Sequence, residues 1–273
     1  MDRFKALERL SEPWLTTEST YANIKQTILT EDINPEQILQ DEQPFESANG
    51  IALVSLKGLM VKHPTPMEQL LLGATCTASF TSQIEQLIGN PSVSGVMLDL
   101  DSGGGSVQGV IEASQAVEKL TKEKPVVAFT DGLMASACYW IGSQASDIIA
   151  SPSSRIGSIG VYMPVADYTE QYAKAGIKMD VIRNKEGVHK GAGLEGTKLT
   201  DTQRARMEEE VQEIFNEFKS AIQAKREVKD DAMQGQAFIA KSAVESGLID
   251  AIGSFEDAFF ILEKAVKKQQ GLT

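Results

Sequence analysis

Two short segments combine small residues with hydroxyl groups in a way that suits chemistry on a carbonyl group. The first is Asp101-Ser-Gly-Gly-Gly-Ser-Val107, and the second is Asp131-Gly-Leu-Met-Ala-Ser-Ala-Cys138. Each follows an apolar run and precedes a helical pattern. The first amides of the helix would then point at one place, with the positive end of the helix dipole behind them. Such a site can hold a phosphate or stabilise an oxyanion.

Ser136 in the second segment is placed to act as a nucleophile. It stands between Ala135 and Ala137 at the expected start of a helix, where small neighbours let a substrate backbone approach. The alternative is that Ser136 only caps the helix, a role worth about 1 kcal/mol. The glycine-rich segment lacks the Lys-Ser/Thr ending of a P-loop and the spacing of a dinucleotide site, so its own alternative is a tight turn.

A serine nucleophile needs a base, and the sequence offers few. Histidine occurs only at His63, whose neighbouring prolines indicate an exposed loop, and at His189. Lys190 follows in a glycine-containing segment directly after a predicted strand, residues 179–182. A lysine in such a loop is usually a solvated charge, and as a base it would have to be buried and uncharged. The residues alone leave this choice open.

An alternation of strands and helices that begins at Gly50 would position both segments. It predicts an α/β fold with a mostly parallel sheet and right-handed crossovers. The predicted strands are residues 51–56, 93–100, 125–129 and 147–150, and the predicted helices between them are residues 81–88 and 107–120.

A long helix is predicted after Lys190. Thr200 and Gln203 form a capping box at its start. Apolar residues then recur at helical spacing, and we interpret this stripe as packing against the core or another subunit. Its members are Met207, Val211, Phe215, Phe218 and Ile222. Further predicted elements are a strand at 156–161, a helix near 166–175 and a last helix at 255–266.

Residues 1–48 differ in composition from the rest of the chain. They are mostly polar, and their apolar residues occur in short helical patterns. Asn34 can cap a short helix that opens with Pro35, and residues 41–49 have the composition of a linker. We therefore expect a helical N-terminal arm with a linker, followed by one domain over residues 49–273.

The overall composition disfavours several classes of binding partner. The chain has 273 residues, with 38 Asp and Glu against 26 Lys and Arg, and its net charge of −12 disfavours nucleic acid. Cys76 and Cys138 lack the spacing of a disulfide framework or zinc site, and no motif requires a metal or cofactor. The charged N-terminus and the lack of a run near roughly 18 apolar residues predict no signal peptide or membrane anchor, hence a cytoplasmic protein.

At this point the residues resemble a known family, the S49 peptidases, which comprise signal peptide peptidase A and head-maturation proteases of tailed phages. The resemblance covers about residues 50–265 and lies in six blocks in the family's order. The blocks are Asp101-Ser-Gly-Gly-Gly-Ser-Val107, Met134-Ala-Ser-Ala-Cys-Tyr-Trp-Ile141, Asp147-Ile-Ile-Ala-Ser-Pro152, Gly157-Ser-Ile-Gly-Val161, Gly187-Val-His-Lys-Gly191 and Gly247-Leu-Ile-Asp-Ala-Ile-Gly253. The family usually has Ser-Pro-Gly-Gly in the first block, where this chain has Gly103 in place of the proline.

The resemblance implies a ClpP/crotonase-like fold of repeated β-β-α units and a Ser–Lys dyad. Ser136 matches the family's nucleophile and Lys190 its general base. Ser158 matches a serine that orients the lysine. The implied oxyanion donors are backbone amides at Gly104, or Gly105, and at Ala137.

The resemblance also implies partners. The polar arm and the lack of an anchor are more similar to the phage branch, so the expected substrates are scaffold and capsid proteins, and the expected assembly is a homo-oligomeric ring or dome. Four alternatives stay open. They are a cytoplasmic peptide-degrading protease, a Ser–His–Asp peptidase using His189, a crotonase-type acyl-CoA enzyme, and an assembly factor without catalysis.

Overall fold

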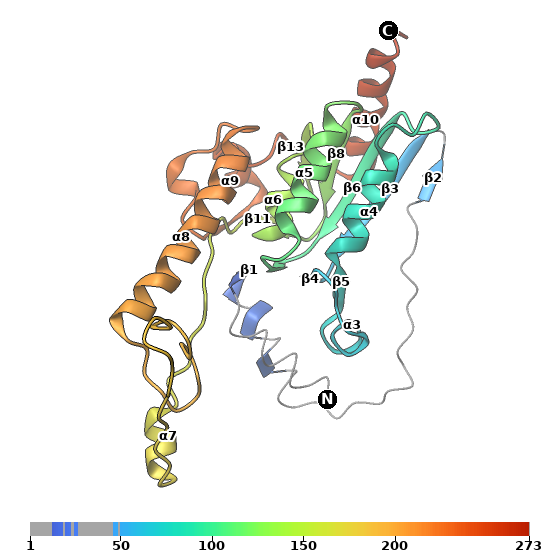
Figure 1. The fold of residues 1–273 in the computed structure, drawn as a ribbon. Coiled ribbons are helices and arrows are strands. Elements are labelled where there is room, and N and C mark those ends of the chain that lie inside the picture. Colours follow the sequence, from blue (N-terminus) through green and yellow to red (C-terminus); the bar gives the residue numbers. More distant parts are fainter. Residues whose placement is uncertain (1–12, 19, 23–24, 27–45, 49, 273) are drawn as a thin grey trace.

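A six-stranded sheet whose strands are parallel except at one edge forms the centre of the molecule (Figure 1). The computed structural model describes residues 13–18, 20–22, 25–26, 46–48 and 50–272, so the helix expected at Asn34 lies outside the described residues. The sheet runs in the order β13-β10-β8-β6-β3-β2, and only β2 is antiparallel to its neighbour. Its strands are β2 (Glu46–Ala48), β3 (Ile51–Lys57), β6 (Gly95–Asp101), β8 (Val126–Thr130), β10 (Asp147–Ala150) and β13 (Ala251–Ile252).

Helices cover both faces of this sheet, as a parallel sheet requires. Side chains of β6 alternate between the faces: Val96 and Leu98 belong to the core cluster with α4 (Thr77–Leu87) and α5 (Val110–Thr121), whereas Met97 packs in the cluster with α10 (Phe255–Gln269). The expected α/β class with a mostly parallel sheet is confirmed.

Short second strands extend the long ones and then lead into helices. β3, β6 and β8 are each followed by such a strand and a helix, which gives the expected repeated β-β-α unit. The second strands belong to two small sheets, of order β1-β7-β4-β5 and β12-β11-β9. Their members are β1 (Trp14–Thr16), β4 (Leu59–Val61), β5 (Ala74–Cys76), β7 (Gly104–Ser106), β9 (Leu133–Ala135), β11 (Arg155–Gly157) and β12 (Ala237–Ile239).

Two local expectations are wrong. The glycine-rich segment does not open a helix, because residues 104–106 form β7 and the helix α5 begins only at Val110, after a left-handed Gly109. The part of residues 41–49 that the structure describes contains strand β2. The described part of the arm is helical at residues 18, 20–22 and 25–26, as expected, and it also contributes strand β1 to a sheet of the domain.

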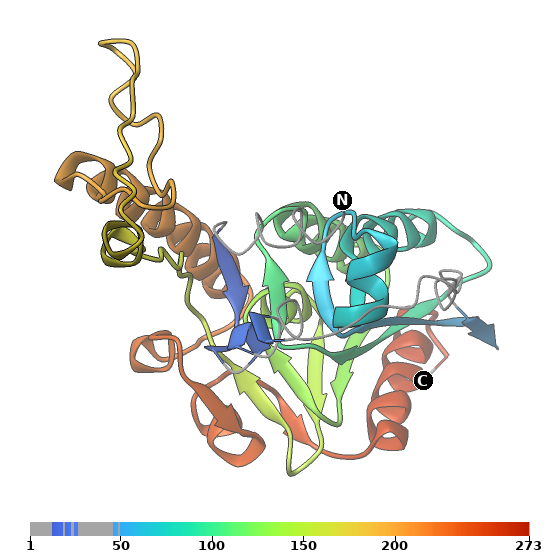
Figure 2. The ribbon, with the colours of Figure 1, turned by 90° about the horizontal axis from the view of Figure 1, so that it is seen from below.

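Residues 163–200, here called the extension, project from the body together with the first half of α8 (Asp201–Gln223) (Figures 1 and 2). The expected capping box of Thr200 and Gln203 opens α8, and the second half of α8 packs on the core through Phe218 and Ile222. The strand expected at 179–182 is not formed. The remaining helices are α3 (Pro66–Leu72), α6 (Ala137–Gly142), α7 (Thr169–Lys174), η2 (Asp230–Ala232) and α9 (Ala240–Glu245).

Candidate active site

Ser136 lies at a sharp turn between strand and helix. Strand β9 ends at Ala135, which pairs with Gly157 of β11, and α6 begins at Ala137. Between them Ser136 has φ 53° and ψ −120°, a conformation that L-residues rarely adopt. Its amide donates to the carbonyl of Gly157 at 2.8 Å, which fixes the turn. A hydroxyl residue held on a strained strand-to-helix turn is the arrangement of a nucleophile elbow.

The side chain of Ser136 does not cap its helix. It makes no capping hydrogen bond, and the residue is only 1% exposed. Its hydroxyl is buried and has no hydrogen-bond partner within the part of the chain that the structure describes. The capping alternative is therefore wrong, and a buried hydroxyl without a partner calls for a different explanation.

Ser158 stands beside Ser136 at the end of the neighbouring strand. Ala135 and Gly157 are partners in the parallel pair of β9 and β11, and each serine directly follows one of them. Ser158 also has a positive φ, of 52°, and its amide donates to the carbonyl of Gln236 at 2.8 Å. The fold thus brings together two of the side chains that the sequence singled out.

The backbone of the glycine-rich strand lies against the start of α6. A Cβ atom at Gly104 would be 3.0 Å from the amide nitrogen of Ala137, and one at Gly105 would collide with the backbone of Met60. Glycine is required here because the backbones approach so closely. As the first residue of α6, Ala137 has an amide without an acceptor inside the helix. The amide of Gly104 donates to the hydroxyl of Ser102 at 3.0 Å.

Lys190 is not brought to Ser136 within one chain. Its side chain is exposed, on the extension. The carbonyl of Val188 accepts from the side chain of Gln203 at 3.2 Å, which ties this segment to the first turn of α8. Helix α8 packs against the core from Ile214 onward. Phe218 lies about 22 Å along the helix from Gln203, at a rise of about 1.5 Å per residue.

At that point the ring of Phe218 stacks on Trp140, one turn beyond Ser136, with centroids 4.7 Å apart and planes 8° apart. The burial that Lys190 would need as a base is therefore absent in the single chain. His189 lies exposed in the same segment.

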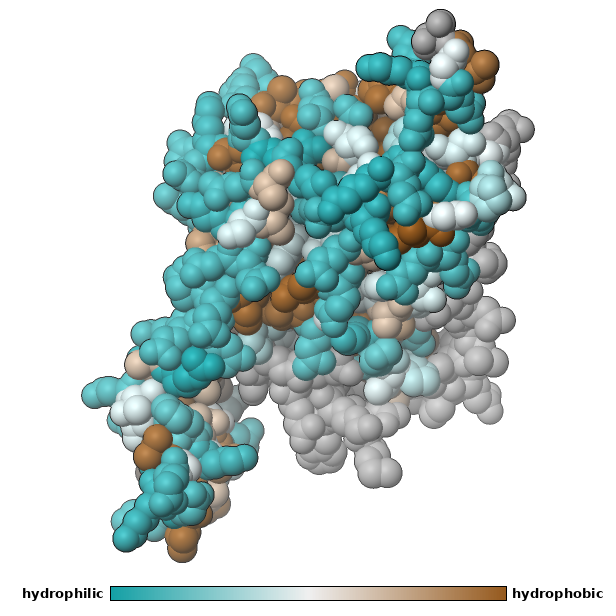
Figure 3. Space-filling model, turned by 45° about the horizontal axis from the view of Figure 1, so that its top comes forward, coloured by the Kyte–Doolittle hydropathy of each residue, from teal (hydrophilic) through white to brown (hydrophobic). Residues whose placement is uncertain are grey.

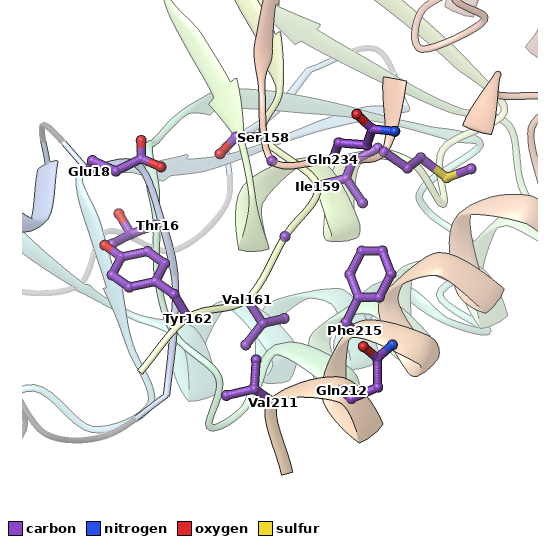
Figure 4. Close-up of a pocket in the computed structure, with 13 residues that line it drawn as sticks. Thr16, Glu18, Ser158, Ile159, Val161, Tyr162, Val211, Gln212, Phe215 and Gln234 are labelled. Atoms are coloured by element: carbon purple, nitrogen blue, oxygen red, sulfur yellow. The ribbon is translucent and has the colours of Figure 1, made fainter. Parts of the chain in front are cut away.

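A cavity of about 300 Å³ opens beside Ser158, between residues 158–162 and α8 (Figure 4). Its walls are partly apolar, with Val161, Val211 and Phe215. Thr16 and Glu18 of the N-terminal segment close one side. These two residues were not predicted from the sequence. The only sequence signal for them is a short run with strand propensity, from Trp14 to Thr17, that follows a proline.

Two neighbouring groups are held in their neutral forms. Burial raises the pKa of the Cys138 thiol far above its usual range, so this cysteine, two residues from Ser136, is not a rival nucleophile. Burial, followed by the negative charge of Glu18, raises the pKa of the Tyr162 hydroxyl. Within the described residues, no helix is long and apolar enough to cross a membrane.

The site thus has a serine on a strained turn beside backbone amides, and the comparison with known protein families points to the same kind of chemistry. A family model described as peptidase family S49 matches residues 118–269, more than half of the chain. The chain belongs to peptidase family S49.

Relatives within this family include phage and bacterial proteins. The head-tail preconnector protein of Enterobacteria phage P21 is 28% identical over 81% of this S49 chain and 44% of its own length. The capsid assembly protease C of Escherichia phage lambda is 25% identical over 81% of this chain and 51% of its own. Protease 4 of Haemophilus influenzae is 27% identical over 83% and 36%. The chain spans about half or less of the length of these relatives.

Among solved structures, an enoyl-CoA hydratase/isomerase family protein from Silicibacter pomeroyi is similar with a TM-score of 0.47 and 11% identity, over 82% of this S49 chain and 80% of that chain. An enoyl-CoA hydratase of Mycobacterium smegmatis has a TM-score of 0.47 and 12% identity, over 83% and 76%.

Proposed function

We propose that this chain is a serine endopeptidase that uses Ser136 as nucleophile and Lys190 as general base. The observation that carries the proposal is the hydroxyl of Ser136, which is buried, without a hydrogen-bond partner among the described residues, and held at φ 53° at the start of α6. Such strain is kept where the surrounding structure enforces it, and it is concentrated at functional sites. Membership of a peptidase family supports this reading over an acyl-CoA enzyme.

In the proposed reaction, the uncharged amine of Lys190 takes the proton of the Ser136 hydroxyl as its oxygen attacks the scissile carbonyl. The amide of Ala137 and an amide of Gly104 or Gly105 stabilise the oxyanion, and one such donor is typically worth about 3 kcal/mol. The protonated lysine then gives its proton to the leaving amine. Water, deprotonated by the lysine, hydrolyses the acyl-enzyme, and Ser158 holds the lysine in place.

A neighbouring copy of the chain is the proposed source of the lysine. The extension that carries Lys190 projects from the body and has apolar residues on its surface (Figure 3). Ile182 is 95% exposed. Docking of the extension on a second copy would bury these side chains and remove the lysine from water, which favours its uncharged form. The exposed apolar residues are Val165, Ile177, Met179, Ile182, Val188 and Leu194.

The proposed substrates are scaffold and capsid proteins of a phage or prophage, cleaved during head assembly. The support is the similarity to a capsid assembly protease and a head-tail preconnector protein. The proposed assembly is a ring or dome of several copies, in which each copy supplies its lysine to a neighbour.

Mixing two inactive variants tests the proposal. Ser136→Ala and Lys190→Met should each abolish labelling by a fluorophosphonate, detected by intact mass, whereas His189→Ala should label normally. Mixed oligomers should recover labelling at up to roughly a quarter of the sites, because random assembly pairs intact serine with a neighbour's intact lysine. Labelling of Ser136→Ala would refute the nucleophile, and loss of labelling only in His189→Ala would refute the lysine base. Without recovery in mixed oligomers, the lysine would act within one chain.

A further inference from the structure

The N-terminal strand β1 lies between the glycine-rich strand β7 and the segment that follows Ser158. On one side it pairs antiparallel with the glycine-rich strand β7, with Leu15 opposite Gly105. On the other side Trp14 exchanges two backbone hydrogen bonds with Tyr162, of 2.8 and 3.2 Å. Tyr162 lies four residues after Ser158, so the short strand spans the space between both halves of the candidate site.

Strand β7 has two edges, and both are taken. One edge pairs with β4, where Met60 stands opposite Gly105, and the other edge pairs with β1. The carbonyl of Leu15 occupies the space that a side chain at Gly104 would need, and the amide of Ala137 borders the same space at 3.0 Å. An extended peptide that pairs with β7 and reaches these amides must therefore take the place of β1.

The strand is held as a peptide is held in a binding groove. Its side chains alternate between two apolar sites: Leu15 is fully buried in the large core cluster, and Trp14 packs with Leu59 and the ring of Tyr21. Thr16 donates from its hydroxyl to the carbonyl of Gly103 at 3.0 Å. Main-chain pairing with alternate side-chain pockets is how sheets bind added strands.

The polar groups around β1 are poorly satisfied while it is in place. Ser106, opposite Trp14, and Tyr162, its partner on the other side, both have buried side-chain hydroxyls without hydrogen-bond partners among the described residues. The hydroxyl of Ser136 is in the same condition. Buried hydroxyls without partners lower the stability of the folded state. Strand β1 thus leaves hydrogen-bonding groups of this groove unused.

We propose that β1 is an internal peptide ligand in the substrate groove, and that a substrate must displace it. The proposal rests on the proposed function, since it takes Ser136 to be the nucleophile. The groove then selects an extended peptide with a large apolar side chain at the position of Leu15. Because Thr16 and Glu18 also wall the cavity beside Ser158, that cavity opens further when the strand leaves.

The test uses full-length protein carrying Ser136→Ala, so that binding is measured without turnover. A fluorescein-labelled peptide with the sequence of residues 11–20 is titrated by fluorescence anisotropy. Leu15→Asp, which places a carboxylate in a fully buried apolar site, should release the strand. If the strand fills the groove nine-tenths of the time, releasing it raises the apparent affinity roughly tenfold. Leu272→Asp, at an exposed leucine, is the matched control and should bind as the parent does.

A milder pair of variants covers the case in which Leu15→Asp fails to fold. Thr17→Pro removes the amide that donates to Gly103, whereas Thr17→Ala keeps it. Only the proline variant should bind the peptide more tightly. Equal affinity in parent and released variants, or loss of cooperative melting in both Leu15→Asp and Thr17→Pro, would overturn the proposal. Fluorophosphonate labelling of the same variants with Ser136 intact reports on the nucleophile separately, so the two proposals fail independently.

Discussion

Replacing Ser136 should stabilise the protein while it removes the nucleophile. Two separate costs meet at this residue: a backbone at φ 53° and ψ −120°, and a buried hydroxyl without a partner among the described residues. Ser136→Ala removes only the hydroxyl, and Ser136→Gly removes both, because glycine adopts positive φ without strain. The two variants therefore separate the two costs.

The expected gains follow from the size of each cost. An unsatisfied buried hydroxyl costs about 1–3 kcal/mol, so we expect Ser136→Ala to raise the free energy of unfolding by about 1 kcal/mol. Backbone strain of this kind costs about 1–3 kcal/mol, and glycine relieves it. Glycine also lowers stability by about 0.5–1 kcal/mol, because it increases the conformational entropy of the unfolded chain. Ser136→Gly should then exceed Ser136→Ala by about 1 kcal/mol. In a domain of this size each kcal/mol raises the melting temperature by about 2–4 °C.

Calorimetry and urea denaturation measure these differences, with Ser114 as the matched control. Ser114 is also buried, but it lies within α5 and its hydroxyl donates to Ile111 at 2.9 Å. Ser114→Gly should therefore destabilise the protein by about 1 kcal/mol. The reasoning is refuted if Ser136→Gly is less stable than Ser136→Ala, or if both variants are less stable than the wild type.

Two further predictions concern packing and pH. Phe218→Ala should lower the free energy of unfolding by about 3–5 kcal/mol, because it removes a fully buried ring stacked on Trp140; a loss below about 1 kcal/mol in urea denaturation would contradict this packing. Burial and the charge of Asp250 raise the pKa of Asp147 in the folded state. The folded protein therefore binds this proton more tightly than the unfolded chain does. Its stability falls as the pH rises from the ordinary Asp pKa to the raised pKa of the folded state. Asp147→Asn should remove that fall and stabilise the protein at neutral pH by less than about 1 kcal/mol, since the group is only half buried; a melting temperature that still falls across this pH window would speak against it.

Elements whose signals are local could be predicted from the amino-acid sequence. The long strands, the capping box of Thr200 and Gln203, and the place of Ser136 at the start of a helix were all predicted from neighbouring residues. Alternating and helical spacings report which face of an element is buried, and a cap acts within one turn. These features need no knowledge of distant partners.

The surroundings of Ser136, in contrast, depend on contacts between segments that are distant in the chain. The glycine-rich segment became a strand because β4 and β1 pair with it, and Trp14–Thr16 became a strand because β7 and Tyr162 offer it two edges. The strand expected at residues 179–182 does not form, and Lys190 is exposed on the extension. Strand pairing joins residues far apart in the chain, so neither propensity nor spacing along the sequence can foresee it.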